Sequence, residues 1–190
     1  RMIFYILLSQ AIARLQIDAA SILLFDPSTN TLEFGAAQGF RVPGIEKKQV
    51  RLCEGIAGRA AEEGIILHQH HLTKEYFLST APLLADEGFT CFYAAPLISK
   101  GKIKGVLEVF ERGHRHRDRD WVDFLNSLAG QAAIAIDNAS LFNELQRSNS
   151  DLRLAYETTL EGWSAALDLR DRETEGHTQR VTKLTEKISR

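Results

Sequence analysis

The chain has 190 residues, of which 44% are hydrophobic and 25% charged, and its formal net charge is −2. This length fits one domain of ordinary size plus an appendage, and the composition is ordinary for a soluble globular protein. The small net charge gives no support to nucleic acid as a partner.

The first part of the sequence predicts a helix followed by a β-hairpin. Apolar residues recur at helical spacing over residues 2–16, and the continuous apolar run 2–8 is far shorter than the roughly 20 residues that span a bilayer. Residues 19–25 (AASILLF) and 31–37 (TLEFGAA) are predicted strands, because the DPSTN between them is strong turn chemistry. We therefore expect no membrane segment here. The two cysteines, Cys53 and Cys91, have no spacing partner, which favours reduced thiols and a cytoplasmic location.

The middle of the chain alternates between short helices and strands. The sequence predicts a strand at 50–52, a helix at 55–63 that ends at Gly64, a strand at 65–68 and a helical or irregular stretch at 73–86 that breaks at Pro82. Strands at 90–98 and 102–110 form a second hairpin across Lys100 and Gly101. This order favours an antiparallel sheet with helices on its faces.

A long helix is predicted from residue 120 to residue 169, a stretch without proline. It would be roughly 75 Å long at 1.5 Å per residue, more than a compact domain of this size needs. We expect its second half to leave the domain and form a coiled coil. Its seam is weakly apolar and could hold a parallel dimer only marginally; it consists of Leu141, Leu145, Ser148, Leu152, Ala155 and Thr159.

Four stretches follow one another along the chain: AASILLFDPSTNTLEF (19–34), EGIAGRAAEEG (54–64), FYAAPLISKGKIKGVLEVF (92–110) and WVDFLNSLAGQAAIAIDNASLF (121–142). In this order they resemble a GAF domain. The resemblance implies an α+β fold over residues 1–142, with a central antiparallel sheet of about six strands, helices on both faces and a long C-terminal helix. It also implies a sensor with a ligand pocket on one face of the sheet, whose first and last helices pair with a second subunit.

The segment 166–181 reads ALDLRDRETEGHTQRV, in which Glu173 and His177 are four residues apart. This end of the chain resembles the beginning of an HD-GYP domain, a bacterial phosphohydrolase that opens c-di-GMP. A carboxylate and an imidazole at this spacing on a helix can supply two ligands to a metal. The resemblance implies that both residues belong to a centre of two or three iron-like ions, whose other ligands would follow later in the sequence.

We therefore expect the 190 residues to be a piece of a longer protein. Residues 143–168 would be a helical linker, possibly a coiled coil, and 169–190 the incomplete start of the HD-GYP domain. No cofactor is assigned with certainty to these residues, which we expect not to be an enzyme themselves. The longer protein would be a metal-dependent c-di-GMP phosphodiesterase.

The ligand pocket is expected among aromatic residues in the second half of the sheet region. The aromatic residues that could stack on a planar ligand are Tyr76, Phe77, Phe89, Phe92 and Tyr93, with Cys91 as a buried apolar residue. Plain core packing is the alternative for the same residues.

Two other features have both a functional and a plain interpretation. His68, His70 and His71 could hold a metal or haem, but they lack fixed ligand spacing and are better explained as polar residues that close a strand. The N-terminal half of GIAGRAAEE (55–63) could present backbone N–H groups to an anion. The plain interpretation, which we prefer, is that its glycines and alanines let a short helix lie close to the sheet.

The function expected from these observations is that of a sensory module. An unknown small molecule would bind it, and a homodimer would pass the signal through the long helix to the downstream phosphodiesterase. The alternative is a ligand-free dimerisation module with no sensing role.

Overall fold

The structure is a computed structural model that describes residues 2–42, 49–113, 115 and 117–188. The chain divides into two units, Arg1–Ala139 and Ser140–Arg190. The first contains the sheet, and the second consists of the later part of the last helix, α4 (Arg119–Ile188).

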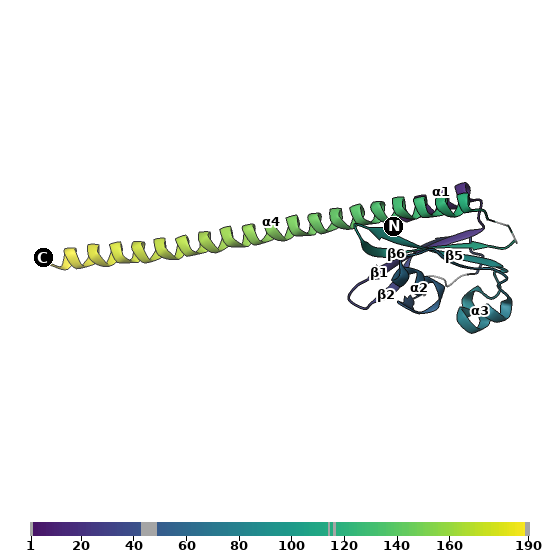
Figure 1. Ribbon diagram of the computed structural model, residues 1–190. Helices are drawn as coiled ribbons and strands as arrows, with labels where there is room; N and C mark the ends of the chain where they lie inside the picture. Colours follow the sequence, from purple (N-terminus) through teal and green to yellow (C-terminus); the bar gives the residue numbers. More distant parts are fainter. Residues whose placement is uncertain (1, 43–48, 114, 116, 189–190) are drawn as a thin grey trace. The chain divides into compact units, whose positions relative to one another are not determined.

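One antiparallel sheet of six strands forms the centre of the first unit (Figure 1). Its strand order is β3-β2-β1-β6-β5-β4, and every neighbouring pair is antiparallel. The strands are β1 (Ala19–Asp26), β2 (Thr31–Gln38), β3 (Gln49–Arg51), β4 (Leu67–Gln69), β5 (Cys91–Ser99) and β6 (Lys102–Glu111). The two long hairpins, β1–β2 and β5–β6, meet where β1 pairs with β6.

Local turn chemistry explains where both hairpins reverse. The carboxylate of Asp26 accepts hydrogen bonds from the backbone N–H and the hydroxyl of Ser28, at 2.8 and 2.7 Å, which closes the first turn. In the second turn, Lys100 and Gly101 have φ values of 51° and 73° between the paired residues Ser99 and Lys102. Two positive φ values in a row define the tight turn that suits a twisted hairpin.

Helices cover the two faces of the sheet. On one face, α1 (Met2–Leu15) and the first part of α4 share a core cluster with inward residues of β1, β5 and β6 (Figure 1). On the other face lie α2 (Gly55–Glu63), α3 (Lys74–Thr80) and the short 3-10 helix η2 (Pro82–Leu84), with a second cluster. The sheet is thus a shared wall between two separate cores.

The predicted fold class is confirmed, down to the turns that join the long strands. α2 has the predicted bounds, and its end at Gly64 adopts the left-handed conformation, with φ 69°. α4 differs from the prediction, because it continues to Ile188 instead of ending near residue 169. Among the described residues, no helix is long and apolar enough to cross a membrane.

Candidate functional site

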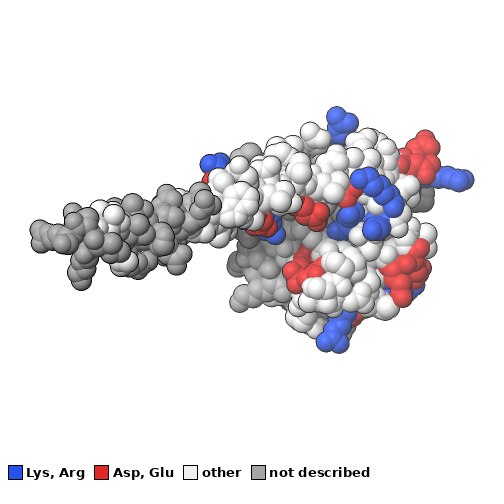
Figure 2. All heavy atoms as spheres, turned by 90° about the vertical axis from the view of Figure 1, so that its left-hand side faces the viewer, with Lys and Arg blue, Asp and Glu red and all other residues white. Residues whose placement is uncertain are grey.

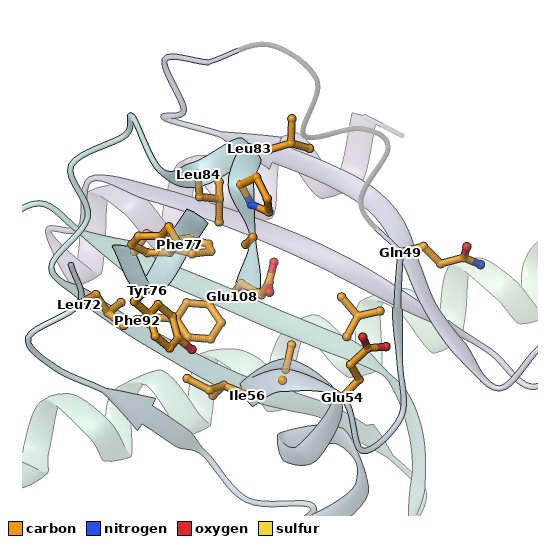
Figure 3. A pocket seen from close by; sticks show the side chains of 16 residues that line it. Gln49, Glu54, Ile56, Leu72, Tyr76, Phe77, Leu83, Leu84, Phe92 and Glu108 are labelled. Carbon is orange, nitrogen blue, oxygen red and sulfur yellow. The ribbon is translucent and has the colours of Figure 1, made fainter. Parts of the chain in front are cut away.

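A small cavity lies on the α2 and α3 face of the sheet (Figure 3). Its volume is about 220 Å³, below the roughly 300–1,000 Å³ of pockets for drug-sized ligands, so a small metabolite would suit it. Five elements supply its walls: β3, α2, the α3–η2 segment, β5 and β6. Its described lining consists of Gln49, Val50, Glu54, Gly55, Ile56, Ala57, Leu72, Tyr76, Phe77, Ala81, Pro82, Leu83, Leu84, Phe92, Glu108 and Phe110.

The helix α2 comes close to the sheet edge because of a glycine. A Cβ atom added at Gly58 would lie 2.3 Å from the carbonyl oxygen of Arg51, so a larger residue would push the helix away. The buried face of the helix is otherwise made of alanines. Close packing is therefore the structural role of the small residues in GIAGRAAEE, the plain interpretation of that motif.

A side-chain cap fixes the start of α3, which carries two aromatic wall residues. The hydroxyl of Thr73 accepts a hydrogen bond from the backbone N–H of Tyr76 at 3.3 Å. Such a cap satisfies a donor that the first turn of a helix leaves open. Tyr76 and Phe77 thereby enter the cavity wall beside Phe92 of β5 (Figure 3).

The floor of the cavity contains a buried carboxylate. Glu108, in the middle of β6, has no exposed surface, and its side chain rises between the aromatic wall and Glu54 (Figure 3). The hydroxyl of Ser21, its cross-strand partner on β1, donates a hydrogen bond of 2.6 Å to Oε2. Our sequence analysis missed Glu108, although an acidic residue at an inward position of an apolar strand was a visible signal.

The predicted pocket residues fall into two groups. Tyr76 and Phe77 line the cavity, and Phe89 lies one layer behind it, with its ring centre 4.9 Å from that of Phe110. Cys91 and Tyr93, which we expected in the pocket wall, do not line this cavity. They belong to the core under α1 and α4, because neighbouring residues of a strand point to opposite faces and Phe92 takes the cavity side.

His68 and His70 lie at the edge strand β4, on the other side of the sheet from the cavity. The rings of His68 and His70 are 4.9 Å apart, and Nδ1 of His70 lies 3.3 Å from the sulfur of Cys91. His68 also stacks on Tyr93. Within the described part of the chain, no three His, Cys, Asp or Glu residues are placed so that they could hold a metal ion.

An ion cluster ties the β5–β6 hairpin to α4. The carboxylate of Asp137 lies 2.5 Å from Nζ of Lys104 and 3.1 Å from Nζ of Lys100, and Ser99 donates a hydrogen bond to it. These interactions, that with Lys104 above all, lower the pKa of Asp137 to about 2. The strands that floor the cavity are thus fixed to the last helix.

Glu173 and His177 lie within the span of α4, but their side chains are outside the described residues. The metal-ligand prediction for this pair therefore stays a prediction.

Comparison with known proteins gives a consistent result for the first unit. A family model described as "GAF domain" matches residues 3–137. No curated protein matches the chain.

Solved structures agree with this match. The GAF domain of a phosphoenolpyruvate-protein phosphotransferase from Coxiella burnetii is 21% identical, with a TM-score of 0.63, over 75% of this chain and 85% of that one. The second GAF domain of DevS from Mycobacterium smegmatis is 18% identical, with a TM-score of 0.61, over 76% and 97%. A GAF domain/HD domain protein from Geobacter sulfurreducens is 12% identical, with a TM-score of 0.61, over 74% and 93%.

Proposed function

The chain belongs to the GAF domain family, and we propose that it is a regulatory sensory module that binds a small molecule and signals through α4. The single observation that carries this proposal is the cavity at the sheet, because its floor strands also contact the last helix. We place the module at residues 1–142, a linker at 143–168 and the start of a further domain at 169–190.

The coupling would run through β5 and β6, which have one face toward the cavity and the other toward α4. Phe92, Glu108 and Phe110 face the cavity. Their direct neighbours Tyr93, Leu107 and Val109 share the core cluster that includes Leu125 and Ile136 of α4. A ligand that shifts these strands would change the contacts of the helix, provided that it binds the two arrangements with different affinity.

A homodimer is the second part of the proposal, and its seam lies on the later part of α4. Large apolar side chains there are 59–68% exposed at alternating spacings of three and four residues. The stripe runs through Phe142, Leu145, Asn149, Leu152, Tyr156, Thr159 and Trp163. It is more apolar than the seam deduced from the sequence, although both include Leu145, Leu152 and Thr159. An Asn at one core position is typical of two-stranded coiled coils.

The output domain we propose is an HD-GYP c-di-GMP phosphodiesterase. The support is the sequence around Glu173 and His177. In addition, the Geobacter sulfurreducens protein of similar fold is named a GAF domain/HD domain protein. Glu173 and His177 would hold two positions of an iron-like centre of two or three metals. The 190 residues themselves would regulate this reaction and not catalyse it.

Native mass spectrometry of the 190-residue chain tests the sensory part. We expect a dimer that retains an additional small mass. A dimer that stays at its bare mass after incubation with a metabolite extract would favour a second candidate, a dimerisation module with no ligand. The exposed stripe of α4 supports that candidate independently of the cavity.

The output part is tested in a longer protein that continues past residue 190. Glu173→Ala and His177→Ala should each abolish c-di-GMP hydrolysis and lower the bound metal, because each removes a ligand. Glu175→Ala removes a carboxylate from the same segment and should leave both unchanged. Unaltered hydrolysis in the first two variants would contradict the assignment.

A further inference from the structure

Arg112, which directly follows β6, lies between two carboxylates from segments that are far apart in the sequence. Its Nη2 donates to Oε2 of Glu87 at 2.5 Å, and its Nη1 lies 4.0 Å from Oδ1 of Asp18. The backbone N–H of Arg112 also donates to Oδ2 of Asp18, at 2.9 Å. One residue therefore connects the segment after η2 with the segment between α1 and β1.

Further contacts fix the guanidinium group of Arg112 in this position. Its Nε donates to the carbonyl oxygen of Glu87 at 2.9 Å, and Nη2 donates to the carbonyl oxygen of Gly39 at 3.1 Å. Its Cζ lies 4.6 Å from the ring centre of Phe89. The side chain of Arg112 is 16% exposed, and that of Glu87 is fully buried. A planar guanidinium can donate in several fixed directions and stack on a ring at once, which a lysine ammonium cannot do.

Glu87 is tied to the wall of the cavity. Its backbone N–H donates to the carbonyl oxygen of Leu84 at 3.1 Å, and Leu84 is a buried lining residue (Figure 3). Oε1 of Glu87 accepts from the backbone N–H groups of Arg41 and Val42, at 2.6 and 2.7 Å. A buried carboxylate depends on such donors and on its ion pair, so it moves together with them. A displacement of the η2 wall would therefore displace Glu87 and the guanidinium group paired with it.

Asp18 lies close to the end of α1, whose last residue is Leu15. The carbonyl oxygen of Leu15 accepts a hydrogen bond of 3.1 Å from the indole Nε1–H of Trp121. The last carbonyl groups of a helix have no partner within the helix, and here an indole supplies one. The indole N–H of Trp121 therefore reports on the end of α1.

We propose that Glu87, Arg112 and Asp18 form a relay between the cavity and the end of α1. A ligand that moves the η2 wall would move Glu87, and Arg112 would pass this displacement to Asp18 and the last turn of α1. The relay is separate from the coupling of β5 and β6 to α4, because it ends at another helix. The inference rests on the proposed sensory function and adds a second element that the ligand would control. Such coupling is demonstrated when two perturbations depend on each other.

A truncation in the cavity wall serves as the perturbation, so that the test needs no ligand. Leu84→Ala alters the η2 wall, and two-dimensional NMR of the 190-residue chain measures hydrogen exchange at the indole N–H of Trp121. The exchange rate should rise roughly fivefold or more, because a weakened hydrogen bond opens more often. Trp163, the other tryptophan of the chain, is 67% exposed on the later part of α4 and should keep its rate.

The variant Arg112→Lys tests whether the effect passes through the relay. Lysine keeps the charge but loses the planar fork, so Leu84→Ala should add less than about twofold to the Trp121 exchange rate in this background. Arg59→Lys is the matched control, because Arg59 is 57% exposed and donates to Glu63 through two nitrogens. In that background Leu84→Ala should keep its full effect.

A second control removes a lining side chain from another wall of the cavity. Ile56 lines the cavity from α2. Ile56→Ala should change the Trp121 exchange rate by less than about twofold, since α2 does not belong to the relay. Equal effects of Leu84→Ala and Ile56→Ala would overturn the relay, because they would reflect a general loss of stability.

The decisive comparison is that of Leu84→Ala with and without Arg112→Lys. Equal effects on the Trp121 exchange rate in the two backgrounds would overturn the relay. If Leu84→Ala or Arg112→Lys does not fold, the milder Leu84→Val and Glu87→Gln take their places, since glutamine keeps the shape of Glu87 without its charge. Native mass spectrometry decides separately whether the chain retains a small molecule, so the relay and the sensory proposal can fail independently.

Discussion

The two units of the chain differ in what surrounds their apolar side chains. In Arg1–Ala139 the apolar residues fill two core clusters, one on each face of the sheet. In the second unit every described side chain from Ser140 onward is exposed, including Leu145, Leu152 and Trp163. The first unit buries its own apolar surface, whereas the helix of the second unit contains no core of its own among these residues.

This difference shows that two parts of one helix can depend on different packing partners for their stability. Helices in proteins gain most of their stability from an apolar face that is packed against something else. The first part of α4 has that support in the sheet, through Leu125, Ala129 and Ile136. The later part has an apolar stripe that only another chain or another domain could cover, in agreement with the proposed dimer.

The difference between the packed and the exposed parts of α4 is tested most strongly by a leucine-to-alanine substitution in each part. Leu125→Ala should lower the free energy of unfolding by about 2–5 kcal/mol, because Leu125 is fully buried and its loss leaves a cavity. Leu152→Ala, at a residue that is 68% exposed, should change it by about 0.5 kcal/mol or less in the monomer. Urea unfolding followed by circular dichroism, at a concentration where the chain is monomeric, measures both. Equal losses of unfolding free energy would contradict the comparison, because they would mean that Leu125 and Leu152 are packed to the same extent.

A second test asks whether the exposed stripe of α4 is an interface. Changing Leu145 and Leu152 together to Asp should raise the dimer dissociation constant by about 100-fold or more, because four carboxylates would face one another in the seam. Analytical ultracentrifugation gives the constant for each protein.

Leu154→Asp is the matched control for this test. Leu154 is 65% exposed, nearly the same as Leu152, but it lies outside the stripe. Its substitution should change the dissociation constant by less than about threefold, since an exposed surface position tolerates a charge. A dimer that is equally sensitive to Leu154→Asp and to the seam variant would place the interface elsewhere on the helix.

The fold was predictable because its signals are local. Two chain reversals and one helix end are set by the backbone preferences of the residues that form them. These are the turn between β1 and β2, the turn at Lys100 and Gly101, and the end of α2 at Gly64. The end of α4 was not predictable in this way, because no proline or turn cluster marks residue 169 and the helix continues to Ile188.

The cavity was only half predictable, for a geometric reason. The alternation of a strand shows that Cys91 and Tyr93 share one face and Phe92 the other, but it does not show which face has the cavity. That choice depends on where α2 and α3 lie, which is a property of the whole sheet. The acidic residue Glu108 could have decided it, since a buried carboxylate among apolar neighbours marks the unusual face.

The smallest effect we predict is at Asp137, which lies near the end of the packed first part of α4, just before its exposed later part begins. Its pKa of about 2 is below its ordinary value of 3.8, because Lys104, Lys100 and Ser99 stabilise the charged form. The stability that comes from a lowered acid pKa is present above the unfolded value and is lost as the pH falls through the folded one. Asp137→Asn should therefore be less stable than the unaltered chain near neutral pH, and the gap should shrink between about pH 4 and pH 2.

Urea unfolding at about pH 6, 4 and 2.5 measures this gap. Glu63→Gln removes the same charge from an exposed pair on α2, and its small effect on stability corrects for the change in net charge. A gap for Asp137→Asn that is the same at all three pH values would mean that Asp137 acts by shape and hydrogen bonding alone. A gap that closes at low pH would identify a charge-based tie between the β5–β6 hairpin and α4, at the place where a signal from the cavity would have to enter the helix.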